Sequence, residues 1–538
     1  MSESRIKILP EEIINKIAAG EVVERPASVV KELVENSIDA GATIIAIEVQ
    51  KSGKKLIRVS DNGCGMSPEE INLALQRHST SKIKSIDDLF NIQTLGFRGE
   101  ALPSIASVSK LKIEPNPSGC GLTVEVKDLF YNVPARKKFL KSDATELGHI
   151  GEIISKYVIS FPQISFKFIS DGKPLLMSTG SGKLIEAIVA VYGTELAKEL
   201  MEINYQFPNG NIYGFISRPT ISRIDRSYET FYVNQRYVRN FLLNRALEDA
   251  YRNLIPNQRY PVGIIFIEID PKKVDINVHP TKREVKFANN QEIMEALTTA
   301  VKGNLSHLTE KQIVRFSEKI ERTMKTWQPE MTSPFFSAAP LETQINIIPE
   351  PSLSPIYQLK QTYIIATDHE ELVLIDQHAA AERIIYDQLS EQNHANHKQF
   401  LLVPETIELN PSEGIILKNH LPYLHALGFE IEEFGVNSFI VRALPTFFTK
   451  INTKQLIIDL IGELYEIGKS AQIEVVQEKI KKVIACHSAI KAGEKLSSAQ
   501  MLQLIKDLFA TKNPSTCPHG RPTMIRLTEK DLAKKFKR

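Results

Sequence analysis

The sequence predicts a multidomain α+β protein with two folded parts joined by a short linker. Its 538 residues are too many for a single hydrophobic core, so two to four domains are expected. Strand-like runs alternate with helical patterns from Ile13 to about Ala300, which indicates layers of helices and sheet. A proline-rich stretch follows, and a second, smaller α/β unit comes after it.

In the first part, a helix is expected at residues 27–40, because apolar residues recur on one side of it. The strand-like runs are rich in β-branched and aromatic residues. They are residues 44–49, 56–60, 123–126, 230–233 and 262–269.

The proline-rich stretch permits neither a helix nor a central strand, so we expect a linker at residues 323–353. Beyond it, residues 357–375 are predicted to form two strands around a turn at residues 368–371. Helical patterns dominate from His378 onward, which gives a second α/β unit at residues 354–538.

The composition limits the class of protein. The formal net charge is +2 with 24% of residues charged, so any contact with DNA must come from local basic patches. No run of about 18 apolar residues is present. The four cysteines are too scattered for a disulfide framework. We therefore expect a cytoplasmic protein with reduced thiols and no membrane contact.

The polar side of the helix at residues 27–40 is the first candidate for chemistry. It carries Glu32, Glu35, Asn36 and Asp39. Glu32 and Asn36 stand four residues apart, so one face can direct a general base and a magnesium ligand to the same point. A solvated polar face is the alternative interpretation.

Two glycine-bearing segments follow this helix. A predicted strand ends at Asp61, and Gly63 and Gly65 allow close backbone approach, so Asp61 can accept a hydrogen bond from an exocyclic amine such as that of adenine. An ordinary turn is the alternative. Residues 96–102 place glycines before a helix start, whose free amides favour phosphate. A flexible loop between helices is the alternative there.

Taken in order, these segments resemble the ATP-binding motifs of the MutL family, within the GHKL superfamily of gyrase, heat-shock chaperone and histidine kinase ATPases. The resemblance implies a GHKL ATPase α/β sandwich at residues 1–203 and a ribosomal-protein-S5-like transducer subdomain at residues 204–322. It also implies that Glu32 activates the attacking water, Asn36 holds magnesium and Asp61 reads adenine. The matching segments are residues 18–26, 32–42, 61–65, 77–82 and 96–102.

The same resemblance implies further ATP contacts. Residues 77–82 belong to a lid that closes with the second glycine segment on the triphosphate, and a lysine in the loop at residues 277–282 reaches the γ-phosphate. The residues concerned are Gly63, Gly65, Arg77, Ser79, Thr80, Ser81, Lys82, Gly96, Phe97, Arg98, Gly99, Glu100 and Lys282. The chain departs from the family after Lys110, where the segment before Gly121 is short and Leu122 replaces the usual hydroxyl residue.

The second unit collects side chains that bind metals. His378 and Glu382 stand four residues apart on a predicted helix, a spacing suited to a shared ion. Carboxylates, imidazoles and thiols together suit zinc or a two-metal site. Surface ion pairs and core cysteines are the alternative interpretations. The candidate ligands are Asp376, His378, Glu382, Cys486, Cys517 and His519.

Residues 376–382, 485–487 and 517–522 resemble the endonuclease-bearing branch of the MutL family. The resemblance implies metal-dependent strand incision in which Asp376 and Glu382 are catalytic, with zinc and manganese as candidate metals. Asp387 departs from the family, whose helix motif ends in glutamate. On an ideal helix it is rotated about 140° from Glu382, so we expect a structural role for it.

The family resemblance also implies partners. Gln399, Leu402 and Pro404 resemble a docking peptide for the replication sliding clamp, with a plain strand as the alternative. The expected protein is a homodimeric, ATP-driven clamp that acts in mismatch repair with the mismatch-recognition protein MutS and holds DNA with little base readout. The rivals are a matchmaker whose carboxyl-terminal zinc is structural, and a chaperone or topoisomerase subunit on the same ATPase fold.

Overall fold

The computed structural model describes most of the chain. The described residues are 23–77, 79–82, 94–96, 99–116, 120–256, 259–275, 285–306, 353–368, 371–391, 398–446, 452–467, 473–489 and 494–536. Phe97, Arg98, Lys282 and the predicted linker, apart from Leu353, lie outside them. Within the described ranges, no helix has the length and apolar content needed to cross a membrane.

The first sheet has the strand order β3-β4-β2-β1-β5-β6. Its strands are β1 (Ile44–Gln50), β2 (Leu56–Asp61), β3 (Lys110–Pro115), β4 (Leu122–Lys127), β5 (Ser165–Ser170) and β6 (Lys173–Met177). Alternate residues of β1, namely Ile45, Ile47 and Val49, are buried in a core shared with helices α2 (Pro26–Asp39) and α6 (Asp143–Ser160). The three strands predicted in this region and the helix before them are confirmed.

One prediction about α2 was wrong. Glu35 was assigned to the polar side of the helix, but it is 7% exposed and its carboxylate accepts a hydrogen bond from Tyr157 of α6 at 2.6 Å. A helical wheel cannot anticipate this contact, because α6 begins more than a hundred residues later in the chain.

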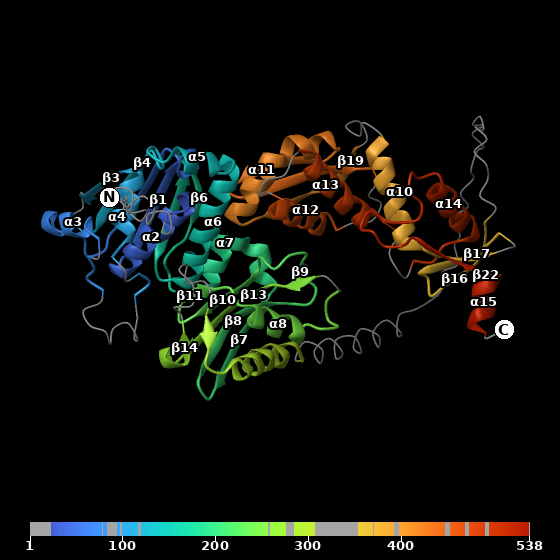
Figure 1. Cartoon of the computed structure of the whole chain (residues 1–538), viewed down its shortest axis with the longest axis horizontal. Coiled ribbons are helices and arrows are strands. Elements are labelled where there is room, and N and C mark those ends of the chain that lie inside the picture. Colours follow the sequence, from blue (N-terminus) through green and yellow to red (C-terminus); the bar gives the residue numbers. More distant parts are fainter. Residues whose placement is uncertain are drawn as a thin grey trace, which may run out of the picture.

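The second sheet has the strand order β11-β10-β13-β8-β7. Its strands are β7 (Leu200–Phe207), β8 (Gly210–Ser217), β10 (Glu229–Val233), β11 (Arg236–Val238) and β13 (Gly263–Ile269), so the two strands predicted here are confirmed. Phe231 of β10 packs in a core with α8 (Phe241–Ala250), whereas Tyr232 joins the core of the first sheet. Helix α6 lies between the two sheets (Figure 1).

Shorter elements complete the amino-terminal half. The helices are α3 (Pro68–Ala74), α4 (Ala101–Val108), α5 (Pro134–Phe139) and α7 (Leu184–Lys198), with 3-10 turns η1 (Lys51–Gly53) and η3 (Pro271–Lys273). Two short ribbons pair β9 (Ser222–Arg223) with β12 (Tyr260–Pro261) and β14 (Val274–Asp275) with β15 (Lys286–Phe287).

The carboxyl-terminal half contains two sheets. The third sheet has the order β16-β17-β18-β22, with β16 (Ser354–Leu359), β17 (Tyr363–Thr367), β18 (Glu371–Asp376) and β22 (Met524–Thr528). Helices α10 (Gln377–Glu391) and α14 (Ser498–Phe509) share a core with one of its faces, and α15 (Glu529–Lys535) follows β22. The prediction of two strands in this region was incomplete, because a further strand, β16, precedes them.

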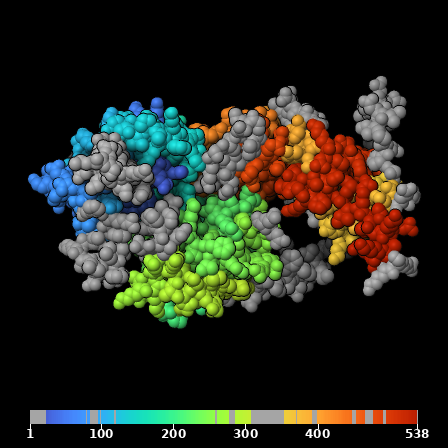
Figure 2. All heavy atoms as spheres, in the orientation of Figure 1, coloured from blue at the N-terminus to red at the C-terminus, as the bar shows by residue number. Residues whose placement is uncertain are grey.

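The fourth sheet has the order β19-β21-β20, with β19 (Lys398–Glu408), β20 (Glu430–Gly435) and β21 (Ser438–Pro445). Helices α11 (Pro411–Ala426), α12 (Thr453–Ile467) and α13 (Ile473–Ser488) share its core. Helix α11 also lies against α6 of the amino-terminal half. In the space-filling view, orange atoms of the carboxyl-terminal half meet cyan atoms of the amino-terminal half (Figure 2).

Candidate functional site

Asp61 is fixed at the end of β2 by three donors. Its Oδ2 accepts a hydrogen bond from the hydroxyl of Ser37 at 2.8 Å. Its Oδ1 accepts from the amide of Gly63 at 2.9 Å and from the amide of Leu122 at 3.3 Å. Because Leu122 uses its backbone here, the missing hydroxyl noted in the sequence does not remove this contact. The carboxylate is therefore buried and oriented before any ligand arrives.

The glycines around Asp61 allow the backbone segments to approach one another. A Cβ on Gly121 (φ +88°) would lie 1.9 Å from the carbonyl oxygen of Asp61, and one on Gly63 would lie 2.8 Å from that of Ala40. Gly65 also has a positive φ of +72°. These close approaches hold the ends of α2, β2 and the start of β4 together.

Asp39 contacts both Lys82 and the segment at residues 94–96. Its Oδ1 accepts from the amide of Leu95 at 2.9 Å, and its Oδ2 accepts from the amide of Gly96 at 3.1 Å. The ammonium of Lys82 lies 2.6 Å from Oδ2. The sequence analysis assigned no role to Asp39, although it lies three residues after Asn36 on the same helical face and that spacing could have identified it.

The two predicted phosphate segments meet at the polar face of α2. Lys82 donates to Oδ1 of Asn36 at 2.9 Å. A Cβ on Gly99 (φ +63°) would lie 2.4 Å from the carbonyl oxygen of Ser79, so these backbones are in direct contact. The structure thus brings Lys82 into contact with Asn36, places Gly96 beside Lys82 and Asp39, and sets Gly99 against Ser79.

The other predicted nucleotide residues lie nearby in sequence. Thr80 accepts from the amide of Lys82 at 3.1 Å, and Glu100 is the residue before α4. Arg77 is half-buried and Ser81 is exposed. Glu32 pairs with Lys31 at 2.8 Å, and about a quarter of its side chain, 24%, is exposed.

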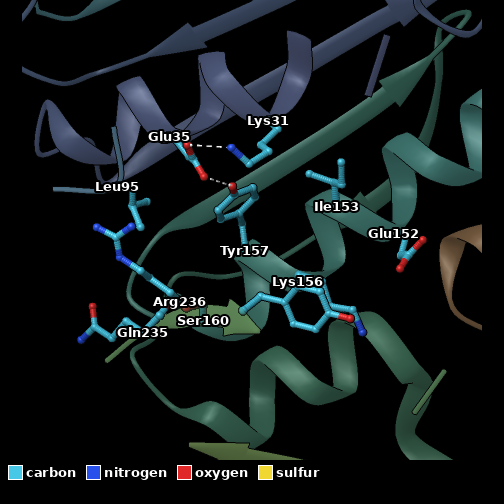
Figure 3. A pocket seen from close by; sticks show the side chains of 11 residues that line it. Lys31, Glu35, Leu95, Glu152, Ile153, Lys156, Tyr157, Ser160, Gln235 and Arg236 are labelled. Carbon is cyan, nitrogen blue, oxygen red and sulfur yellow. Dashed lines mark hydrogen bonds and ion pairs between the residues drawn. The ribbon is translucent and has the colours of Figure 1, made fainter. Parts of the chain in front are cut away.

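A pocket that the sequence did not indicate lies between α2, α6 and the turn from β10 to β11 (Figure 3). Glu35 and Lys31 of α2 line it with Tyr157 of α6 and Arg236, which follows the turn between β10 and β11. The guanidinium of Arg236 donates to the carbonyl oxygen of Thr94. The second sheet therefore touches the same loop that Asp39 holds.

A second site lies at the start of α10. Oδ1 of Asp376 accepts from the amides of His378 and Ala379 at 3.0 and 3.1 Å, so this carboxylate caps the helix. His378 then lies one turn before Glu382, with Nε2 of His378 3.2 Å from Oε1 of Glu382.

Glu382 is shared by two groups of potential metal ligands. One group contains His378, Glu382 and Cys486, the other Glu382, Cys517 and His519, and within each group the ligand atoms lie within 4.8 Å of one another. Burial would raise the pKa of Glu382, but hydrogen bonds with His378 and His519 outweigh it and hold that pKa well below its usual range. Five of the six predicted ligands are thus brought together; Asp376 belongs to neither group.

The composition of these groups fits a metal. Glu382 and Cys517 are each 2% exposed, so a carboxylate and a thiol are taken out of water beside two imidazoles. Such a mixture of oxygen, nitrogen and sulfur ligands suits zinc or a related transition metal. Asp387 instead pairs with Arg383 at 3.0 Å and accepts from the amide of Lys512 at 2.8 Å, the structural role expected for it.

The predicted docking peptide lies in β19. The pairing of β19 with β21 is irregular between Phe400 and Glu405, so residues 401–404 leave the regular ladder. Leu402 is fully exposed, and Val403 is 72% exposed. Gln399 and Pro404 are exposed as well.

Three family descriptions match the sequence. Residues 24–127 match the histidine kinase-, DNA gyrase B- and HSP90-like ATPases, and residues 188–306 match the carboxyl-terminal domain of DNA mismatch repair proteins. Residues 356–496 match the MutL C terminal dimerisation domain.

Curated relatives match nearly the whole chain. The DNA mismatch repair protein MutL of Halothermothrix orenii is 37% identical over 98% of this chain and 99% of its own length. The MutL protein of Geotalea daltonii is also 37% identical, over 99% of this chain and 100% of its own length. A solved amino-terminal domain of a DNA repair protein is 26% identical, covering 55% of this chain and 98% of its own, with a TM-score of 0.47.

Proposed function

The chain belongs to the MutL family of DNA mismatch repair proteins, and from this premise we propose that it is an ATP-driven dimeric clamp that nicks DNA with its carboxyl-terminal domain. The observation that carries the ATPase part is the convergence of Lys82 and Gly96 on Asn36 and Asp39. The observation that carries the nuclease part is the pair of ligand groups that share Glu382.

At the ATP site, Asn36 holds magnesium and Asp61 accepts from the adenine amine. The position between Asn36 and Asp39 is suited to a cation, because the ammonium of Lys82 already lies there. Glu32 stands one helical turn before Asn36 and acts as the general base.

The ATPase proposal is tested with Glu32→Ala. General-base catalysis contributes about 10²–10⁴-fold, so we expect hydrolysis to fall at least a hundredfold while ATP binding is retained. Glu69→Ala is the matched control, because Glu69 is exposed on α3. Equal hydrolysis by the Glu32 variant and the control contradicts the assignment.

In the carboxyl-terminal domain, Glu382 is the shared ligand and His378, Cys486, Cys517 and His519 complete the two groups. Bound divalent ions would activate a water and stabilise charge on the phosphodiester oxygens. Asp376 orders the first turn of α10 and so positions His378. Zinc and manganese are the candidate metals.

Nicking of supercoiled plasmid in the presence of manganese tests this part. We expect Glu382→Gln, which removes the charged ligand shared by both groups, to abolish nicking and Glu32→Ala to retain it, since the two sites are on different domains. Metal analysis of the same preparation accompanies the assay. Bound zinc without nicking would favour the rival matchmaker, in which the metal is structural.

Homodimerisation is proposed for the open face of the third sheet. The pairing register aligns Tyr357, Ile365, Leu374 and Ile525 in one row across four strands, on the face away from α10 and α14. Tyr357 and Ile525 are 59% and 56% exposed. An apolar row of this kind is typical of an interface.

DNA, MutS and the sliding clamp are the proposed partners. Lys137 and Lys138 on α5 are exposed and offer a local basic patch for the phosphate backbone, which predicts salt-sensitive binding. The exposed apolar residues of β19 support clamp docking. The chaperone and topoisomerase interpretations have no support from the relatives, whose names are those of mismatch repair proteins.

A further inference from the structure

We propose that the two halves of one chain dock on each other through a defined intramolecular interface, anchored by the carboxylates of Glu413 and Asp459. We call this interface the latch. It connects the helix that carries Glu32 to the helix that carries Cys486. We also propose that the latch influences metal binding at Cys486. That part rests on the metal site proposed above, whereas the docking itself does not.

The first anchor is a buried polar cluster at the start of α11. The hydroxyl of Tyr228, in the loop before β10, donates to Oε2 of Glu413 at 2.7 Å and accepts from the side-chain amide of Asn410 at 3.1 Å. The guanidinium of Arg223 lies 4.1 Å from the centre of the Tyr228 ring. All four side chains belong to residues no more than 9% exposed.

Around this cluster, the backbones approach closely. Gly151 of α6 faces α11, and a Cβ there would lie 3.4 Å from Cβ of Pro411. At the kink of α7, the amide of Thr194 donates to Oε2 of Glu408 at 2.5 Å. The side-chain amide of Asn437 donates to the carbonyl oxygen of Leu175 at 2.6 Å.

The second anchor is a charge pair between Arg259 and Asp459 of α12. Two nitrogens of Arg259 reach the two carboxylate oxygens of Asp459, each at 2.9 Å, and the Asp459 side chain is 2% exposed. Nε2 of His487 on α13 lies 2.8 Å from the same carboxylate. His487 directly follows Cys486, a proposed metal ligand, in the chain. Arg259 is therefore connected to that ligand through Asp459 and His487.

The matched placement of these polar groups on the two halves argues for one specific docked arrangement. A carboxylate taken out of water costs several kcal/mol unless it is paired, and a broken buried pair leaves one charge uncompensated. Glu413 and Asp459 each have a partner on the amino-terminal half of the chain, namely Tyr228 and Arg259. A shifted arrangement that keeps these carboxylates buried without their partners is therefore unfavourable, which favours this docked arrangement over others.

The latch also reaches the proposed nucleotide site. Helix α6 touches α11 at Gly151 and, less than two turns later, places Tyr157 against Glu35 of α2. Glu35 lies three residues after Glu32 on that helix. Shifts of α2 can thus be transmitted through α6 to the latch, and through Asp459 and His487 to α13.

Hydrogen exchange of the full-length protein tests the latch. The test variants are Tyr228→Phe, which removes the hydroxyl that donates to Glu413, and Arg259→Ala, which removes the guanidinium that pairs with Asp459. Loss of one such contact is worth roughly 1–2 kcal/mol, so amides at residues 148–156 and 408–416 should exchange about 5- to 30-fold faster. Arg226→Ala is the matched control, because Arg226 pairs with Glu248 within the amino-terminal half.

Unchanged exchange in both variants overturns the proposal, as does wild-type exchange at the rate of unprotected amides. If Arg259→Ala fails to fold, Tyr228→Phe still decides the matter. Zinc titration of the same proteins supplies the second readout, and we expect weaker binding at unchanged stoichiometry in Arg259→Ala. Wild-type protein that binds no zinc contradicts the proposed metal site but leaves the exchange test valid, whereas equal zinc affinity in both proteins rejects the link to Cys486.

Discussion

The ammonium of Lys82 lies 2.9 Å from Oδ1 of Asn36 and 2.6 Å from Oδ2 of Asp39. The segment at residues 79–82, predicted to belong to a lid over ATP, thus supplies a cation to the polar face of α2. Asp39 also accepts hydrogen bonds from the amides of Leu95 and Gly96, so one carboxylate contacts both predicted phosphate segments. The order of the phosphate segments therefore depends on Asp39 as much as on the glycines.

Asp39→Asn is expected to weaken ATP binding about tenfold or more. An amide side chain keeps one acceptor oxygen but loses the charge that attracts Lys82, and hydrogen bonds to charged groups contribute about 1.5–3 kcal/mol. A fluorescent ATP analogue measures the change in affinity. Asp128→Asn is the control, because Asp128 pairs with Lys110 on the surface. Equal affinities for the two variants would show that Asp39 does not order the lid.

The sequence predicted the positions of these residues on their helix and strand better than it predicted their contacts. The spacing of Glu32 and Asn36 placed both on one side of α2, and Asp61 indeed ends a buried strand. The helical periodicity of α2 wrongly placed Glu35 on the polar side, because its partner Tyr157 comes from a helix distant in the sequence. Periodicity within one helix carries no information about which other helix will cover it.

The carboxyl-terminal half shows a related limit. Strand β16 was missed because its turn to β17 uses Lys360 and Gln361 at positive φ, positions where glycine or asparagine would have signalled a hairpin. The proposed metal ligands could be singled out because their residue types are unusual. Their division into two groups around Glu382 could not, because it depends on how α13 and the loop at residues 510–523 fold back onto α10.

Glu229 predicts a pH dependence of stability. Burial raises its pKa to about 8, Asn244 donates to one of its oxygens, and the other has no hydrogen-bond partner among the described residues. The folded state therefore binds a proton that the unfolded state loses at lower pH, so this group's contribution to stability falls as pH rises from about 4.5 to about 8.

Glu229→Gln should remove this dependence. A shift of one pKa unit corresponds to about 1.4 kcal/mol, so we expect the variant to exceed the wild type by at least that amount at pH 8 and to match it near pH 4.5. Denaturant unfolding at several pH values measures the difference. A variant that is less stable than the wild type at pH 8 would show that the carboxylate is favourably bound when charged.

Removal of metal is expected to destabilise the carboxyl-terminal domain. A ligand that binds only the folded state stabilises it by about 2.7 kcal/mol at a hundred times its dissociation constant, so chelation should lower the thermal transition of wild-type protein. Cys517→Ser should show the lower transition with or without zinc, while Cys64→Ser, an exposed cysteine in the other half, should behave as wild type. Calorimetry with and without chelator measures the transition temperatures. If zinc still raises the transition temperature of Cys517→Ser, that thiol is excluded as a ligand.

The apolar row on the third sheet predicts how the dimer can be broken. Tyr357 and Ile525 lie at the two ends of the row, on the first and last strands of the sheet order. Glutamate at both positions would bury two charges per protomer in the interface, and an unpaired buried charge costs several kcal/mol. We expect the double variant Tyr357→Glu/Ile525→Glu to sediment as a monomer at concentrations where the wild type is a dimer. Phe434→Glu, at a residue 66% exposed on β20, is the matched control and should remain dimeric. A double variant that stays dimeric while retaining its fold would move the interface to another surface.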